Sequence, residues 1–301
     1  MSDTTGRLRE AVGRYGIWSI GLRSEDAARR GELAEAASEL EELGYGAVWL
    51  GGNSTARNAA PLIEATGRIV VATSIQSIWQ QDPATTAAEF TELEAAHPGR
   101  FVLGLGVSHG PRVRQYRKPY TTMVGHLDRL DELDRSGEGG VPAGRRVLAA
   151  LGPRMLELSR DRAAGAIPYL VTPDHTARAR AVLGEAALLA PEFKVVLETD
   201  PARARTLARS CLAPYLELPN YTNNFLRLGF TESDIAGGGS DRLIDALVAW
   251  GEESRIRDRV EEFHTAGADH VALQVITDGP VDALPRQEWR RLASLLETGA
   301  K

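Results

Sequence analysis

The chain has 301 residues, of which 43% are hydrophobic and 25% are charged, and its formal net charge is -6. This length suits one α/β barrel of about 250 residues, so we expect a single domain over residues 1–301. The acidic balance argues against a nucleic-acid partner, and the lone Cys211 excludes an internal disulfide and a thiolate metal cage. Neither a signal peptide nor an apolar run of about 20 residues is present, so we expect a cytoplasmic protein without membrane contact.

Short apolar runs alternate with segments of helical periodicity along the whole chain. The predicted strands lie at residues 15–20, 46–50, 69–73, 101–105, 146–150, 165–171, 193–197 and 270–275. A helix is predicted over residues 25–43, where apolar residues recur at helical spacing and Gly44 follows as a stop. Later helix starts match the N-cap pattern at Asp82-Pro83, Asp174, Asp200-Pro201 and Ser240-Asp241.

Repeated β–α units with strands that are apolar on both faces favour a parallel sheet closed as a TIM (β/α)8 barrel. An open doubly wound sheet is the alternative, although its glycine fingerprint after the first strand is missing. Residues 214–240 form an insertion between the predicted strands 7 and 8, and long insertions in compact folds often cover a substrate. The amphipathic helices are compatible with a homodimer but do not demand one.

In such a barrel the reacting groups lie at the carboxyl ends of the strands, and these ends do not fit the common hydrolytic classes. Only His109 and His175 lie at predicted strand ends, and no HxH or HExxH pair occurs, so we expect no metal site. Glu198 lacks a second acid for a glycosidase pair, and no Gly-x-Ser-x-Gly elbow is present. Schiff-base chemistry is poorly supported, because Lys194 is the only lysine that touches a strand.

The groups that remain at the strand ends are glycines, hydroxyls and apolar side chains, which suit a flat cofactor that brings its own chemistry. Gly104 and Gly106 end one apolar strand and let a backbone or a flat ligand approach closely, although such glycines equally serve packing. The basic run from Arg112 to Lys118 favours an anionic ligand tail over a plain solvated loop. The helix that begins after Gly152 offers free N–H groups to a phosphate.

Several stretches together resemble the bacterial luciferase-like family, and within it the oxidoreductases of actinobacteria that depend on the deazaflavin coenzyme F420. The matching stretches are residues 100–109, 147–155, 161–173, 198–205 and 266–271, in the order that the family has them. The resemblance covers about residues 15–297 and implies a TIM barrel with the cofactor ring at its carboxyl mouth. The arginine-rich, lysine-poor composition suits a GC-rich actinobacterial genome.

The resemblance also implies where the cofactor lies. A bulge after the third strand, commonly with a cis peptide, falls on Ser74–Ile75, and the phosphate would lie near the loop after the fifth strand and near the sixth-strand end. The implied cofactor-binding residues are Ser74, Ile75, Gly106, Val107, Ser108, Leu151, Gly152, Pro153, Arg154, Met155 and Thr172.

One departure from the family concerns the proton donor. Many relatives carry an acid–His pair after the second strand, whereas this chain has Asn53, which cannot act as a general acid near neutral pH. We place His109 in that role because histidine titrates in the useful range, and a His109 that only fixes its loop is an equal alternative. Glu198 is a further catalytic candidate, with capping of nearby N–H groups as its alternative, and Asn53 is expected to orient polar groups.

A deazaflavin passes electrons as hydride and reacts poorly with oxygen, so the protein has to hold a substrate against the ring and supply a proton. The residues expected to contact the substrate are Trp18, Gln76, Trp79, His175, Tyr221, Asn223 and Asn224. The last three would belong to a lid formed by the insertion, for which a surface loop is the alternative. The two tryptophans equally suit a packing role, and His175 equally suits a solvent-facing position.

The leading hypothesis is therefore an oxidoreductase that transfers a hydride between coenzyme F420 and a small organic substrate. The first alternative is an FMN-dependent monooxygenase of the same family, because both classes use the same pocket. The second is a non-catalytic barrel that binds a ligand, which the missing acid–His pair keeps open.

Overall fold

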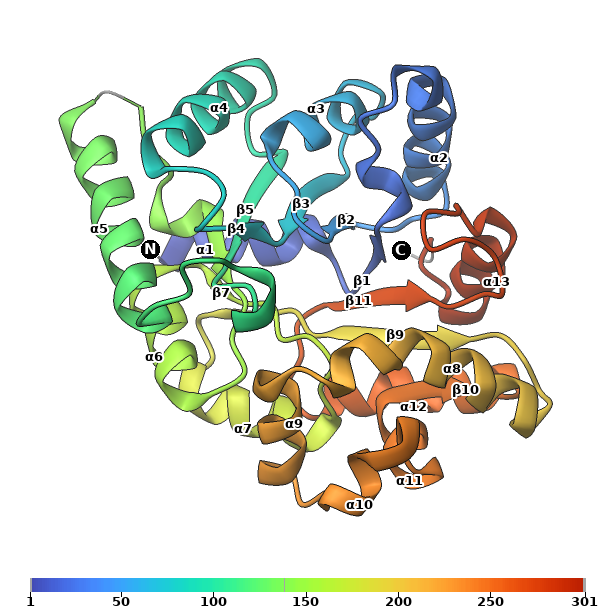
Figure 1. Cartoon of the computed structure of the whole chain (residues 1–301). Coiled ribbons are helices and arrows are strands. Elements are labelled where there is room, and N and C mark those ends of the chain that lie inside the picture. The colour runs from blue at the N-terminus through green and yellow to red at the C-terminus, as the bar shows by residue number, and fades with distance from the viewer. Residues whose placement is uncertain (1, 138, 300–301) are drawn as a thin grey trace.

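The computed structural model describes residues 2–137 and 139–299, in which helices surround a curled sheet (Figure 1). The strands are β1 (Tyr15–Ser19), β2 (Ala47–Gly51), β3 (Val70–Ser74), β4 (Gln76–Ser77), β5 (Phe101–Gly106), β6 (Arg146–Leu148), β7 (Gly165–Ala166), β8 (Leu188–Leu189), β9 (Glu192–Val196), β10 (Val248–Trp250) and β11 (Val271–Val275). The helices are α1 (Ser2–Val12), α2 (Arg30–Glu42), α3 (Ala56–Glu64), α4 (Pro83–Ala96), α5 (Pro119–Ser136), α6 (Pro153–Arg162), α7 (Pro173–Leu183), α8 (Pro201–Leu216), α9 (Pro219–Arg227), α10 (Glu232–Ile235), α11 (Asp241–Leu247), α12 (Glu253–Thr265) and α13 (Arg286–Leu296).

The sheet is parallel and has the strand order β10-β9-β11-β1-β2-β3-β5-β6-β7-β8, with β4 paired to β5. Segment 188–196 contributes strands near both ends of this order. Strand β8 is the last strand and pairs with β7, whereas β9 lies next to the first strand, β10, and also pairs with β11. The Glu192 N–H donates to Pro168 O on one side, and the Ala272 N–H donates to Pro191 O on the other, each over 2.9 Å. The chain therefore has a curled, TIM-barrel-like α/β fold.

The predicted strands agree with β1, β2, β3, β5, β6, β9 and β11 to within about two residues at each end. The sixth predicted strand, residues 165–171, shortens to β7, because Pro168 has no N–H to donate and Leu170 has a positive φ of 55°. The short strands β4, β8 and β10 were not predicted. Side chains of Asp82, Asp200 and Ser240 cap α4, α8 and α11 as predicted, whereas α7 is capped by Thr172 and not by Asp174.

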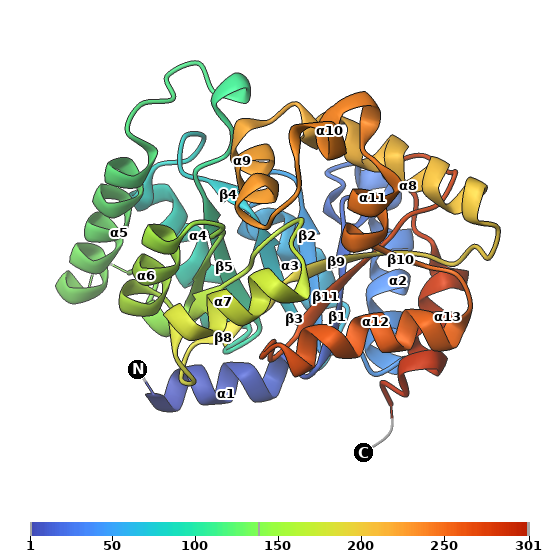
Figure 2. The same ribbon diagram turned by 90° about the horizontal axis from the view of Figure 1, so that it is seen from below.

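The segment predicted as an insertion, residues 214–240, consists largely of helices between β9 and β11. Helix α8 continues through Pro214 to Leu216, and α9 and α10 follow before Ser240 caps α11. Tyr221, Phe225 and Phe230 pack in one apolar cluster with side chains of α8 and α11. Helix α9 lies on the opposite side of the sheet from α1 (Figure 2). No helix within the described residues is long and apolar enough to span a membrane.

Helix α1 packs across the amino ends of the strands, where Leu8 and Val12 join a buried cluster with Trp49. His270 is fully buried beside it and donates from Nδ1 to Gly13 O over 2.9 Å, because a carbonyl oxygen can only accept. Its Nε2 then accepts from Trp49 Nε1, also over 2.9 Å. A Cβ on Gly16 would lie 2.6 Å from this Nε2, so the glycine makes room for the imidazole.

Burial lowers the pKa of His270 to about 4, from an ordinary value of 6.5. The stability contribution of neutral His270 is thus fully present above pH 6.5 and is lost as the pH falls toward 4, on the order of 3 kcal/mol in all. We predict that the free energy of unfolding falls between pH 7 and pH 5, and that His270→Gln reduces this slope. Urea titrations at each pH measure it, and an unchanged slope in the variant would contradict the assignment.

Candidate functional site

A cavity of about 420 Å³ opens at the carboxyl ends of the strands. Its lining comes from the ends of β1, β2, β3 and β5, from the loops that follow β5, β6 and β7, and from α8 and α9. The lining residues are Trp18, Ile20, Gly52, Asn53, Ser74, Ile75, Ser77, Gln80, Gly106, Val107, Ser108, His109, Tyr116, Ala149, Ala150, Leu151, Met155, Ile167, Tyr169, Tyr215, Asn220 and Tyr221.

Small residues form one flat part of this lining, namely Gly52, Gly106, Ala149 and Ala150. A Cβ on Gly106 would lie 2.8 Å from Ile75 Cγ1, so the strand end has no room for a side chain there. The Ser74–Ile75 peptide is cis, at the position that the family resemblance implied. The Ile75 N–H donates to Gly52 O over 3.0 Å, which ties the end of β3 to the end of β2. These contacts leave a surface that a planar ligand can approach closely.

Aromatic side chains form the facing part of the lining, with Tyr169 at their centre. The Tyr169 ring centroid lies 5.3 Å from that of Trp18, 5.4 Å from that of Tyr215 and 6.0 Å from that of Tyr221. Trp18 is held in place because its Nε1 donates to Ser74 Oγ over 3.0 Å. The tryptophan thus connects the aromatic wall to the cis-peptide segment.

The hydroxyl of Tyr169 lies 3.0 Å from both the Tyr215 hydroxyl and Gln274 Oε1. A phenol has a single proton and an amide oxygen only accepts, so Tyr169 donates to Gln274 and accepts from Tyr215. Burial raises the pKa of Tyr169 well above its ordinary value, so its phenol is neutral at physiological pH. The wall therefore has an ordered chain of hydroxyl groups, and Tyr169 carries no negative charge.

His109 follows β5 and faces the insertion. Its Nδ1 lies 3.1 Å from Asn220 Oδ1 on α9, and its ring centroid lies 5.4 Å from that of Tyr221. Because the amide oxygen accepts, Nδ1 carries the proton, and Nε2 is the basic nitrogen of the neutral ring. This contact joins the loop after β5 to α9 across the cavity.

The structure brings about half of the predicted site residues together. Those that line the cavity are Trp18, Asn53, Ser74, Ile75, Gly106, Val107, Ser108, His109, Leu151, Met155 and Tyr221. Those outside the lining are Gln76, Trp79, Gly152, Pro153, Arg154, Thr172, His175, Glu198, Asn223 and Asn224.

Among the predicted catalytic residues, Asn53 and Glu198 are held by backbone groups. Asn53 Oδ1 accepts from the Ser77 N–H over 2.8 Å, which fixes the segment after the cis peptide. Glu198 Oε1 accepts from the Asp200 N–H over 3.0 Å, and its other oxygen pairs with Arg203 at 3.1 Å. Glu198 thus caps a backbone N–H group, which is the alternative to a catalytic role.

Several predicted substrate residues lie outside the lining and hydrogen-bond to neighbouring segments. Gln76 Nε2 donates to Thr86 Oγ1 over 2.6 Å, and Trp79 Nε1 donates to Val107 O over the same distance. His175 does not face solvent: it is buried, which lowers its pKa, and its Nε2 donates to Leu151 O over 2.9 Å. In this way His175 holds the loop that presents Leu151 to the cavity.

The remaining predicted lid residues lie on α9 away from the cavity. Asn223 is exposed, whereas Asn224 is buried and its Oδ1 accepts from Arg227 Nη2 over 3.3 Å. Sequence reasoning missed Tyr169, Tyr215 and Asn220. The carboxyl-end rule points to Tyr169 and the aromatic-rich insertion to Asn220, but no sequence signal marks Tyr215 on α8.

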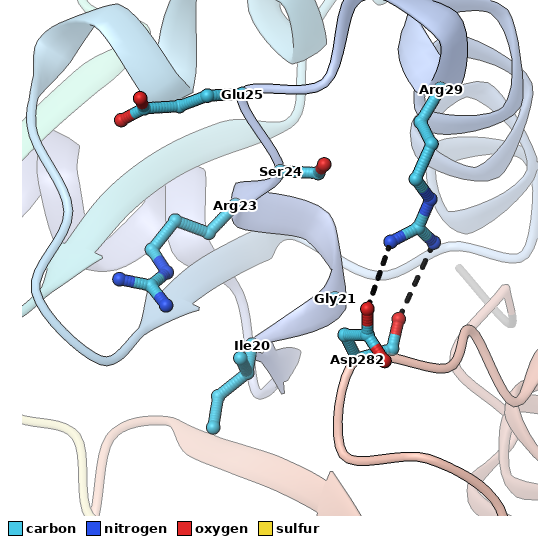
Figure 3. Close-up of a pocket in the computed structure, with 7 residues that line it drawn as sticks. All are labelled: Ile20, Gly21, Arg23, Ser24, Glu25, Arg29 and Asp282. Atoms are coloured by element: carbon cyan, nitrogen blue, oxygen red, sulfur yellow. Dashed lines mark hydrogen bonds and ion pairs between the residues drawn. The ribbon is translucent and has the colours of Figure 1, made fainter.

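A second, more open pocket of about 290 Å³ shares Ile20 with the cavity (Figure 3). Its charged lining residues are Arg23, Glu25, Arg29 and Asp282, so the two signs are balanced. Arg29 Nη2 donates to Asp282 O over 3.3 Å, and Arg23 Nη1 donates to Asn53 O over 2.7 Å. Across residues 2–137 and 139–299, no three His, Cys, Asp or Glu side chains are grouped to hold a metal ion.

The comparison with known proteins agrees with this geometry. A sequence model of the family described as luciferase-like monooxygenase matches residues 16–270, and no curated protein matches the chain. An F420-dependent secondary alcohol dehydrogenase, solved with an F420–acetone adduct, is similar with a TM-score of 0.71 and 13% identity over 96% of this chain and 99% of that chain. The coenzyme F420-dependent tetrahydromethanopterin reductase from Methanopyrus kandleri gives a TM-score of 0.66 and 14% identity, over 97% and 100% of the two chains.

A third similar structure is a type II Baeyer–Villiger monooxygenase in complex with FMN. It is the oxygenating constituent of 3,6-diketocamphane monooxygenase from the CAM plasmid of Pseudomonas putida, with a TM-score of 0.67 and 13% identity over 94% of this chain and 96% of that chain. At identities this low, the structural similarity shows a shared fold and no more. Because the family match spans most of its sequence, the protein belongs to the luciferase-like monooxygenase family.

Proposed function

We propose that this protein is an oxidoreductase that transfers a hydride between coenzyme F420 and a small organic substrate. The observation that carries the proposal is a cavity with a floor of small residues and an aromatic wall, together with the exposed cations next in sequence to its lining residues, which we call the rim. Two of the similar structures are F420-dependent enzymes by name, whereas a third holds FMN, so the choice of F420 depends on this chain's own residues.

The lining fits a planar ring. Gly106 and Ala149 leave the floor free of long side chains, and Trp18 and Tyr169 offer apolar faces opposite. The described lining residues include no Asp or Glu, so the lining offers no carboxylate for acid–base work. A bound deazaflavin supplies the carbon that gives or takes the hydride.

The rim favours an anionic ligand tail. Arg114, Arg117 and Lys118 are exposed in the segment between β5 and α5, whose Tyr116 lines the cavity, and Arg154 is exposed at the start of α6. Within the described part of the chain none of these four cations forms an ion pair, and the side chain of Arg112 lies outside it. F420 carries carboxylates beyond its phosphate, whereas FMN ends at one phosphate, so this rim favours F420.

Residues of the chain have separate tasks in this proposal. As the family resemblance implies, the first turn of α6 from Gly152 to Met155, together with Thr172, would hold the phosphate where the tail leaves the cavity beside Leu151 and Met155. Trp18, Ile75 and Tyr169 exclude water from the reacting atoms. His109 holds a proton at Nε2 in its charged form and delivers it to the substrate oxygen, while Asn220 orients its ring through Nδ1.

Titration with each cofactor tests the choice between F420 and FMN. We predict tighter binding of F420, measured by fluorescence, and a loss of about tenfold in F420 affinity when Arg114, Arg117 and Lys118 are all replaced by Gln, with a smaller loss for FMN. Arg129→Gln is the control, because Arg129 is exposed on α5 but already pairs with Glu132. Tight FMN binding without F420 affinity would reverse the assignment.

Filling the flat floor tests where the ring binds. Ala149→Leu extends a side chain into the cavity, so we predict at least about a tenfold loss of cofactor affinity with little change in melting temperature. Ala149→Gly, which leaves the cavity open, is the control. Unchanged affinity in Ala149→Leu would place the ring elsewhere.

Replacement of His109 tests the proton donor. We predict that His109→Gln lowers kcat by about 10²–10⁴-fold and leaves the cofactor Kd unchanged, because a general acid contributes on that order. Asn220→Ala, which frees the imidazole from its anchor, should give a smaller decrease. Full turnover by His109→Gln would remove His109 from the mechanism and leave it the loop-fixing role.

A further inference from the structure

A buried ion pair lies behind the aromatic wall. Glu192 and Lys194 are two residues apart on β9, so their side chains lie on the same face of the strand. Lys194 is 0% exposed and Glu192 is 4% exposed, and Lys194 Nζ lies 2.8 Å from Glu192 Oε1. Removing two charges from water is costly, and apolar residues of similar volume often stabilise a protein equally well. A contribution to stability therefore does not explain why this ion pair is buried.

Glu192 forms hydrogen bonds to the residues on both sides of Tyr169, namely Pro168 and Leu170. Its backbone N–H donates to Pro168 O over 2.9 Å, and its Oε2 accepts from the Leu170 N–H over 3.4 Å. Leu170 has φ 55°, a left-handed conformation that a leucine keeps only where its surroundings enforce it. Tyr169 lies between these two anchored residues.

Lys194 contacts the tyrosine ring itself. Its Nζ lies 3.9 Å from the Tyr169 ring centroid, within the range of a cation–π interaction, and 5.8 Å from the Tyr215 centroid. Glu192 keeps the ammonium at this place by pairing with it. The ion pair thus contacts both the backbone and the ring of the residue at the centre of the aromatic wall.

We propose that Glu192 and Lys194 are positioning residues, which set the Tyr169 ring at the wall against which the cofactor and substrate bind. They act through Tyr169 and do not line the cavity themselves. The consequence for ligand binding rests on the proposed function, whereas the placement of Tyr169 does not.

The test replaces the pair by apolar residues of similar size, Glu192→Met with Lys194→Met, because a glutamine oxygen could still accept from the Leu170 N–H. We expect the double variant to fold, and its crystal structure to show the Tyr169 ring displaced and Leu170 outside the left-handed region. Cys211→Ala is the control, because Cys211 is a partly buried residue of α8 that packs against the same apolar cluster as Tyr169 and Tyr215. A Tyr169 ring and a Leu170 backbone that stay in place would overturn the proposal.

The second readout is the affinity for F420 and for FMN. We expect the double variant to lose about tenfold, Tyr169→Leu to lose a similar factor, and the combination to lose no more than either alone, because both act through one ring. Additive losses would contradict the proposal. A wild-type protein that binds neither cofactor would contradict the proposed function alone, since the crystallographic readout is independent of it.

Lys194→Met alone provides the same test should the double variant not fold, because burial raises the pKa of Glu192 and lets the remaining carboxyl stay neutral. It removes the ammonium from the Tyr169 ring, so we expect the ring to move. An unmoved ring in this variant would equally overturn the proposal.

Discussion

The backbone hydrogen bonds of segment 188–196 are the contacts on which the rest of the structure depends. This segment bonds to β7 and Pro168 on one side and to β11 on the other, so the sheet curls and its carboxyl ends converge. Convergence brings Trp18 from the first strand against Tyr169 from the turn after β7, although about 150 residues separate them in the chain. The same segment carries Glu192 and Lys194, so the strand that curls the sheet also holds the wall of the cavity.

The cavity combines three physical properties. Its floor is flat because glycine and alanine end the strands, its wall is aromatic, and its rim has cations without acidic partners in the described residues. Such a lining suits the planar anionic cofactor that we propose, and it offers few groups that react on their own. The contact between His109 and Asn220 places an imidazole in the lining, next to α9.

Sequence reasoning predicted the parallel α/β architecture, because apolar strands and capped helices leave strong local signals, as at Asp82 and Asp200. It missed β4, β8 and β10, which are too short for periodicity to detect, and overextended the sixth strand past Pro168. At the site it found the correct strand ends but not which of two adjacent side chains faces the cavity, so Ser77 lies in the lining and Gln76 does not. Tyr215 comes from α8, whose tertiary placement no local pattern encodes.

The most direct measurement of the central claim is a crystal structure of the protein soaked with coenzyme F420. The account predicts the deazaflavin ring against Gly106, Ala149 and Ile75, with its tail directed toward Arg114 and Lys118. A ring bound outside this cavity, or a cavity that stays free of F420 at saturating concentration, would contradict it.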